Sequence, residues 1–108
     1  MPELLGEFEQ LVMLTVLRLG DEAYSAAVRH ELQERAGRDV SPGAIYTTLE
    51  RLEGRGLVDS RYGDPTPERG GRRKRYYRLR PEGRKSLVHA LETVRRVAEG
   101  LEIKLKRS

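Results

Sequence analysis

A run of basic residues spans positions 69–80, RGGRRKRYYRLR, and has the side chains to bind an anionic polymer. Seven of its twelve residues are Arg or Lys, and none is acidic. A planar guanidinium group fits phosphate oxygens, and each phosphate contacted releases counterions from DNA. Most charge runs are only solvated surfaces, but this one also holds paired glycines and two tyrosines. It predicts contact with DNA phosphates or the minor groove through Arg69, Arg72, Arg73, Lys74 and Arg75.

A second candidate contact lies in residues 41–57, SPGAIYTTLERLEGRGL, which reads as one capped helix. Ser41 can cap its N-terminus through the hydroxyl oxygen, and Pro42 fits the first helical position. Gly54 and Gly56 can supply the left-handed conformation that ends a helix. The segment therefore has both its start and its end marked in the sequence.

The two faces of this predicted helix differ in chemistry. Ile45, Leu49 and Leu52 recur at helical spacing and predict a buried stripe. The opposite face is small and polar, as a helix that enters a DNA groove requires, and its candidate contacts are Ser41, Gly43, Tyr46, Thr47 and Arg51. Hydroxyls near a helix N-terminus can bond phosphates, while Thr47 could touch a thymine methyl and Arg51 could bind guanine or a phosphate.

Alternatives stay open for parts of both segments. The capped helix could be an ordinary amphipathic surface helix, and Tyr46 could fill the core instead of contacting DNA. Glu50 could accept a hydrogen bond from cytosine or pair with a nearby arginine. Arg78 and Arg80 lie nearer the base of the basic segment and could be surface residues only.

The elements that must position these residues form a small, mainly α domain with one β-hairpin. Apolar periodicity predicts helices over residues 4–19 and 24–36 before the capped helix. Strand-like sequence follows at 57–62 and 75–79, where Tyr77 and Leu79 alternate onto one face. Three short helices and a hairpin make a winged helix-turn-helix domain, which we assign to residues 1–80.

The remaining segment, residues 81–108, predicts one long C-terminal dimerisation helix. Its apolar residues follow a heptad seam: Leu87, Leu91, Val94, Ala98, Leu101 and Leu105. A helix of this length, roughly 35–40 Å, exceeds what so small a domain can cover. The first helix is also apolar on nearly every side, so Leu11 and Leu14 join the predicted homodimer interface. Gly100 interrupts the seam at a cost of about 1 kcal/mol relative to alanine, unless it allows two helices to approach closely.

Composition excludes several classes of function. The 108 residues carry a net charge of +4 and no cysteine, so there is no disulfide framework and no thiolate site. His30 and His89 lack partners at metal-ligand or triad spacing, so we expect no enzyme, metal or cofactor. The N-terminus has no basic leader, and its apolar run at 11–19 is too short to span a bilayer. We therefore expect a cytoplasmic protein.

With these motifs in view, the chain resembles the PadR family of transcriptional regulators. The two stretches that carry the resemblance are SPGAIYTTLERLEGRGLV and RGGRRKRYYRL, within residues 5–84. The resemblance implies a dimeric winged-helix protein that binds double-stranded DNA, usually a repressor, with C-terminal helices for dimerisation. It also implies that Tyr24 opens the second helix near DNA, with Tyr46 and Thr47 on the recognition helix and Arg73 to Arg75 in the wing.

Some members of that family release DNA when a phenolic acid or a drug-like molecule binds, so a small-molecule effector is compatible with this interpretation. The tail is expected to be a single C-terminal helix, which places the chain among the short members of the family. The chain also departs from the family pattern in two ways. Arg80 stands where a helix-capping threonine is more usual, and aromatic residues are scarce beyond the DNA half, which argues against a drug pocket built by stacking. The alternative function is a winged-helix protein-interaction module with a coiled-coil tail and no DNA role.

Overall fold

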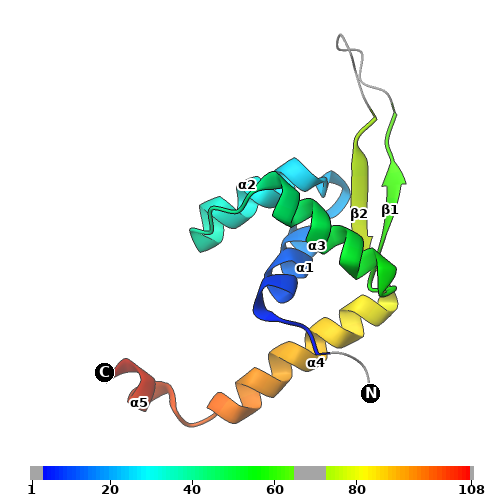
Figure 1. The fold of residues 1–108 in the computed structure, drawn as a ribbon. Helices are drawn as coiled ribbons and strands as arrows, with labels where there is room; N and C mark the ends of the chain where they lie inside the picture. The colour runs from blue at the N-terminus through cyan, green and yellow to red at the C-terminus, as the bar shows by residue number, and fades with distance from the viewer. Residues whose placement is uncertain (1–3, 65–72, 108) are drawn as a thin grey trace.

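The computed structural model describes residues 4–64 and 73–107, within which a two-stranded hairpin stands at one side of a group of helices (Figure 1). In chain order the elements are α1 Glu7–Leu19, the 3-10 turn η1 Gly20–Glu22, α2 Ser25–Ala36, α3 Pro42–Gly54, β1 Val58–Tyr62, β2 Arg75–Leu79, α4 Pro81–Ala98 and α5 Glu102–Lys106. This order confirms the predicted three helices and hairpin. The first helix begins later than residue 4, because the Gly6 N–H donates to Glu9 Oε1 at 3.0 Å and caps the helix there.

Helix α1 lies at the centre of the core. Val12, Met13 and Val16 of α1 are almost completely buried. The other elements contribute Val28, Leu32, Ile45, Leu49, Leu52, Val58, Tyr77, Leu79 and Leu87. The apolar stripe predicted for α3 is therefore the face that packs into the domain, which leaves the opposite face of α3 outward.

Helix α3 has the ends that the sequence predicts. Ser41 Oγ accepts a hydrogen bond from the Ala44 N–H at 3.1 Å, and Pro42 is the first helical residue. Gly54 is the last, and Gly56 turns the chain toward β1 with φ +75°. Helix α3 is thus fixed at both ends by local sequence.

The hairpin is antiparallel and pairs Val58 with Leu79 at its base and Tyr62 with Arg75 toward its tip. A third segment joins it at the edge, since the Tyr77 N–H donates to the Ala23 carbonyl at 2.8 Å and Tyr24 bridges Tyr76. This contact fixes the start of α2 against the wing, a pairing that the sequence analysis missed.

The tail corrects one prediction. Residues 81–108 were expected to form one helix, but α4 ends at Ala98 and the short α5 begins at Glu102. Gly100 lies between them with φ +82°, a left-handed conformation that glycine adopts without strain. The heptad seam is therefore interrupted, and Leu101 and Leu105 do not continue the stripe of α4.

Helix α4 leaves the domain after its first two turns (Figure 1). Only Gly83 and Leu87 of α4 are buried. The radius of gyration is 16.1 Å, whereas a compact chain of this length has about 13 Å. The protruding tail accounts for this elongated shape.

Candidate nucleic-acid interface

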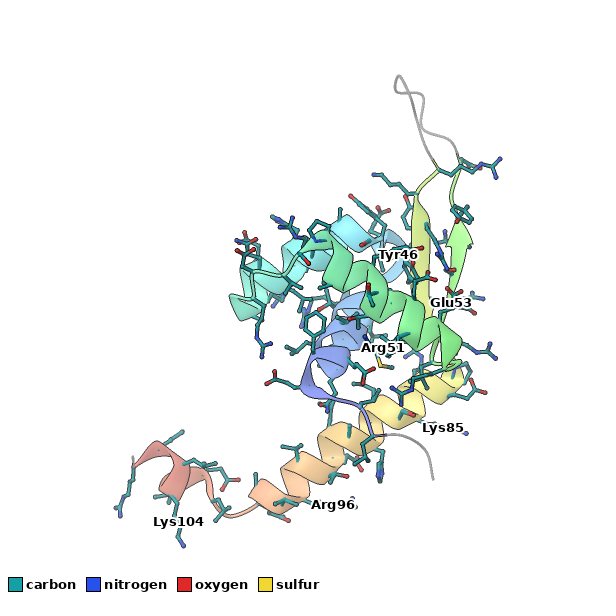
Figure 2. All side chains as sticks on the ribbon, viewed as in Figure 1. Tyr46, Arg51, Glu53, Lys85, Arg96 and Lys104 are labelled. Atoms are coloured by element: carbon teal, nitrogen blue, oxygen red, sulfur yellow. The ribbon has the colours of Figure 1, made fainter. Side chains whose placement is uncertain are left out.

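The outward face of α3 presents the side chains predicted to read DNA. Ser41, Gly43, Thr47 and Arg51 are exposed, and Tyr46 has 50% of its surface accessible (Figure 2). The alternative in which Tyr46 fills the core is therefore wrong. Its neighbour Thr48 is 4% exposed and belongs to the packed face.

Arg51 is held at the lower end of this face by the first helix. Its Nη1 lies 3.8 Å from Glu9 Oε2, and Arg55 contacts the same carboxylate oxygen at 3.2 Å. The Glu9 side chain is mostly buried, while that of Arg51 is 55% exposed. Arg51 can therefore keep this weak pairing or reach outward to a ligand.

The wing brings two of its predicted cations to the surface. Arg73 and Lys74 are exposed, whereas Arg69 and Arg72 lie outside the described residues. Lys74 Nζ sits 4.2 Å from the centre of the Tyr24 ring, close enough for a cation–π contact. Tyr24, at the start of α2, thus meets the wing, in line with its predicted place near the other contact residues.

The same side of the wing holds two residues that the sequence analysis missed. The Tyr76 ring packs edge-on against Tyr24 with 5.7 Å between centroids, and the Arg61 guanidinium lies 5.0 Å from the centre of Tyr76. The signal available in the sequence was strand alternation, which puts Tyr76 on the face opposite to buried Tyr77.

Arg75 has a different place from the one predicted. We expected it among the phosphate contacts, but its side chain is only 23% exposed and points at α3. Its Nη1 lies 2.6 Å from Glu50 Oε1, its Nη2 bonds Glu53 Oε1, and its Nε donates to Ser60 Oγ at 2.9 Å. Arg75 turns toward α3 because the Glu50 and Glu53 carboxylates there pair with its guanidinium group. The same pairing confirms the arginine alternative for Glu50.

Tyr77 closes this cluster from the core side. It is 3% exposed, and the Arg75 guanidinium lies 5.2 Å from its ring centre. Burial raises the pKa of Tyr77 to about 12, and the nearby Arg75 charge acts in the opposite direction. Burial opposes the charge on Arg75, yet Tyr77 and the two carboxylates outweigh it and raise the pKa of Arg75 above its usual value.

The two remaining wing arginines have surface partners. Arg78 Nε donates to Asp59 Oδ1 at 2.7 Å, and Arg80 lies 3.6 Å from Glu82. Exposed pairs of this kind add little to stability, because solvent and salt screen them. Arg80 precedes α4 without capping it through its side chain, as expected from the missing threonine.

The residues predicted for the dimer interface divide into three groups. Leu87 is 3% exposed and packs in the core of its own subunit, so its predicted place in the interface is wrong. Leu11, Leu14 and Ala98 are partly covered. The others are exposed, together with further apolar neighbours: Val88, Leu91, Val94, Val97, Leu101, Ile103 and Leu105.

His30 and His89 are both exposed, and no group of three or more His, Cys, Asp or Glu side chains in residues 4–64 and 73–107 could hold a metal ion. Across the same residues, no helix is long and apolar enough to cross a membrane.

Comparison with known proteins identifies the family. Residues 13–89 match the Transcriptional regulator PadR-like family. The chain belongs to the PadR family. It is 40% identical over 85 residues to the transcriptional regulator Rv3488 of Mycobacterium tuberculosis, covering 74% of this chain and 73% of that protein. It is therefore a PadR-family transcriptional regulator, and such regulators are DNA-binding proteins without enzymatic activity.

Solved PadR structures share the fold. A PadR family transcription regulator from Clostridium difficile R20291 superposes with a TM-score of 0.72 at 24% identity, covering 91% of this chain and 98% of that one. A PadR family regulator from Eggerthella lenta gives a TM-score of 0.68 at 27% identity, over 94% and 88% of the two chains. Both comparisons extend beyond the winged helix into the tail, since they cover more than nine-tenths of this chain.

Proposed function

We propose that this PadR regulator binds a palindromic DNA operator as a homodimer and represses transcription from it. Each subunit would place α3 in a major groove, and a two-fold axis would set the two half-sites about 34 Å apart. Repression would follow from occupying DNA that the transcription machinery needs, in the cytoplasm expected from the sequence.

The observation that carries the homodimer is the exposed apolar surface of the tail. Leu91 and Val94 of α4 are 40% and 63% exposed, although both lie on the face predicted as the seam. Apolar side chains at this spacing are stable in water when another helix covers them. A second copy of the chain offers the same surface, as a two-fold interface requires.

The proposed DNA contacts come from three elements that face the same partner. Helix α3 supplies Ser41, Gly43, Tyr46, Thr47 and Arg51, α2 supplies Tyr24, and the wing supplies Arg73 and Lys74, with Arg69 and Arg72 retained from the sequence. Contacts to phosphates would position the protein, and contacts from α3 to base edges would select the sequence.

A small-molecule effector remains compatible with this function. Residues 81–108 contain no Phe, Tyr or Trp, so stacking on such side chains in this segment would not hold the molecule. An effector would act by changing the spacing of the two recognition helices.

The wing is tested by removing charge where DNA is proposed to lie. Arg73→Ala with Lys74→Ala should weaken binding to all duplexes and reduce the slope of log K against log salt by about 3.6, because the homodimer loses four phosphate contacts that contribute about 0.9 each. Lys85→Ala with Lys104→Ala removes the same charge from α4 and α5 (Figure 2) and should leave the slope unchanged. Equal slopes for wild type and the wing variant would remove the wing from the interface.

The alternative, a protein-interaction module, makes an opposite prediction. Purified protein would then show no salt-dependent DNA binding and would stay monomeric by itself. Membership of a DNA-binding family favours the operator-binding function.

A further inference from the structure

Arg75 joins α3 to the wing at a partly buried point, where the side chains of Arg75, Glu50 and Glu53 are 23%, 40% and 30% exposed. Glu50 and Glu53 lie three residues apart on α3 and therefore share one helix face, and both pair with Arg75 of β2. Arg75 bridges both carboxylates from the strand, with Nη1 at 2.6 Å from Glu50 and Nη2 bonded to Glu53. One side chain thus spans the gap between the two parts that would contact DNA.

Ser60 closes the arrangement from the neighbouring strand. Its hydroxyl donates to Glu53 Oε2 at 2.7 Å and accepts from Arg75 Nε at 2.9 Å. Ser60 pairs with Tyr77 in the hairpin register, so it lies on the same sheet face as Arg75. The three residues form a closed ring of hydrogen bonds, which fixes the direction of each side chain.

The geometry points to Arg75 as a positioning residue that sets the angle between α3 and the wing and so contributes to operator selectivity without touching DNA. The inference rests on the proposed function. The Nη1 atom of Arg75 forms an ion pair with Glu50, Nη2 bonds Glu53, and Nε donates to the Ser60 hydroxyl. Reaching a phosphate would break these contacts and leave two carboxylates unpaired beside α3.

The two possible roles of Arg75, contacting DNA directly or positioning the wing, predict opposite changes in DNA affinity for the Glu53→Gln variant. If electrostatics alone mattered, Glu53→Gln would remove a negative charge near DNA and tighten binding to every duplex. If Arg75 positions the wing, the same change weakens the ring and loosens binding to the operator. Arg75→Lys separates the two roles again, because lysine keeps the charge but cannot form the planar, forked contacts.

The experiment measures the affinity of the full chain for an operator fragment selected from random DNA and for an unrelated duplex of equal length. We expect Glu53→Gln and Arg75→Lys each to lower operator affinity about tenfold with little change on the unrelated duplex. The double variant should lose less than the sum of the two single effects, because both break the same ring. Glu34→Gln is the matched control, since Glu34 is exposed on α2 and has no ion pair among the described residues.

Tighter operator binding by Glu53→Gln, or wild-type selectivity in Arg75→Lys, would overturn the positioning role. Ser60→Ala is a second test. It removes one member of the hydrogen-bonded ring without changing the charge of the protein, and it should lower operator selectivity by a smaller factor. If the wild-type chain selects no DNA, the proposed function itself fails. A wild-type protein that discriminates between duplexes, with variants that discriminate equally, rejects only the role of Arg75.

Discussion

The winged-helix half of the subunit and its tail differ in whether their side chains already have partners within the subunit. Between α3 and the hairpin, charged groups already satisfy one another, as Arg75 does with Glu50 and Glu53. On the tail, apolar side chains such as Val94 and Val97 stand in solvent at 63% and 76% exposure. In the proposed function the first region binds DNA, and the second packs against the tail of another copy of the chain.

This difference separates two kinds of residue that look alike in sequence. Arg73 and Arg75 are both wing arginines, yet one is exposed and the other is enclosed by acids. Leu87 and Leu91 are both seam residues, yet the first is in the core and the second is outside it. We therefore assign contacts with other molecules to the side chains that are exposed in the isolated subunit, and structural roles to those that are paired or buried in it.

The largest expected effect comes from charging the tail. Leu91→Glu combined with Val94→Glu should give monomers, because two unpaired carboxylates per subunit would be buried at the proposed interface. Operator affinity should fall about hundredfold, since two linked half-site contacts become independent. Sedimentation equilibrium measures the first effect and DNA titration the second.

Thr93→Glu is the control for this variant, because Thr93 lies on a different side of α4 and is exposed. It should remain dimeric. If the variant with Glu at positions 91 and 94 is still a dimer, the interface lies elsewhere. The exposed apolar side chains of the tail would then not mark a dimer surface.

The next largest effect is expected at Gly83, where α4 packs against the winged-helix domain. A Cβ on Gly83 would lie 2.1 Å from the Leu57 carbonyl oxygen, so α4 can dock only with glycine there. Gly83→Ala should lower the free energy of unfolding by about 1–3 kcal/mol, the usual cost of overpacking. Gly54→Ala, where no atom lies within 4 Å, should cause no such loss in urea denaturation. Equal stability of both variants would contradict the tight docking of α4.

The smallest effect concerns the break in the tail. Gly100 has φ +82°, which disfavours alanine by roughly 1–2 kcal/mol, while alanine favours a helix over glycine by about 1 kcal/mol. Gly100→Ala should therefore shift the tail toward one continuous helix and increase the circular-dichroism signal at 222 nm. An unchanged signal would mean that residues other than Gly100 impose the break.

Much of the fold could be predicted because its determinants are local. Ser41, Pro42 and Gly56 mark the recognition helix, and the alternation of Tyr77 and Leu79 marks the inner face of β2. The exposed face of α3 followed directly, since it is the side opposite to the apolar stripe. These features depend on spacing along the chain, which the sequence displays.

The errors arose where distant residues meet. Arg75 was assigned to DNA because composition cannot reveal that Glu50 and Glu53 face it across the domain. Leu87 matched the heptad but lies where α4 still contacts the core. The aromatic contact of Tyr24 with Tyr76 depends on an edge pairing between residues about fifty positions apart, which strand propensity does not specify.

The central claim is that two copies of this chain read DNA together, and selection of bound fragments from random duplex DNA tests it most directly. The account predicts an enriched inverted repeat whose half-sites are centred about one helical turn apart, roughly 34 Å. A single asymmetric half-site, or no enriched sequence at all, would contradict it.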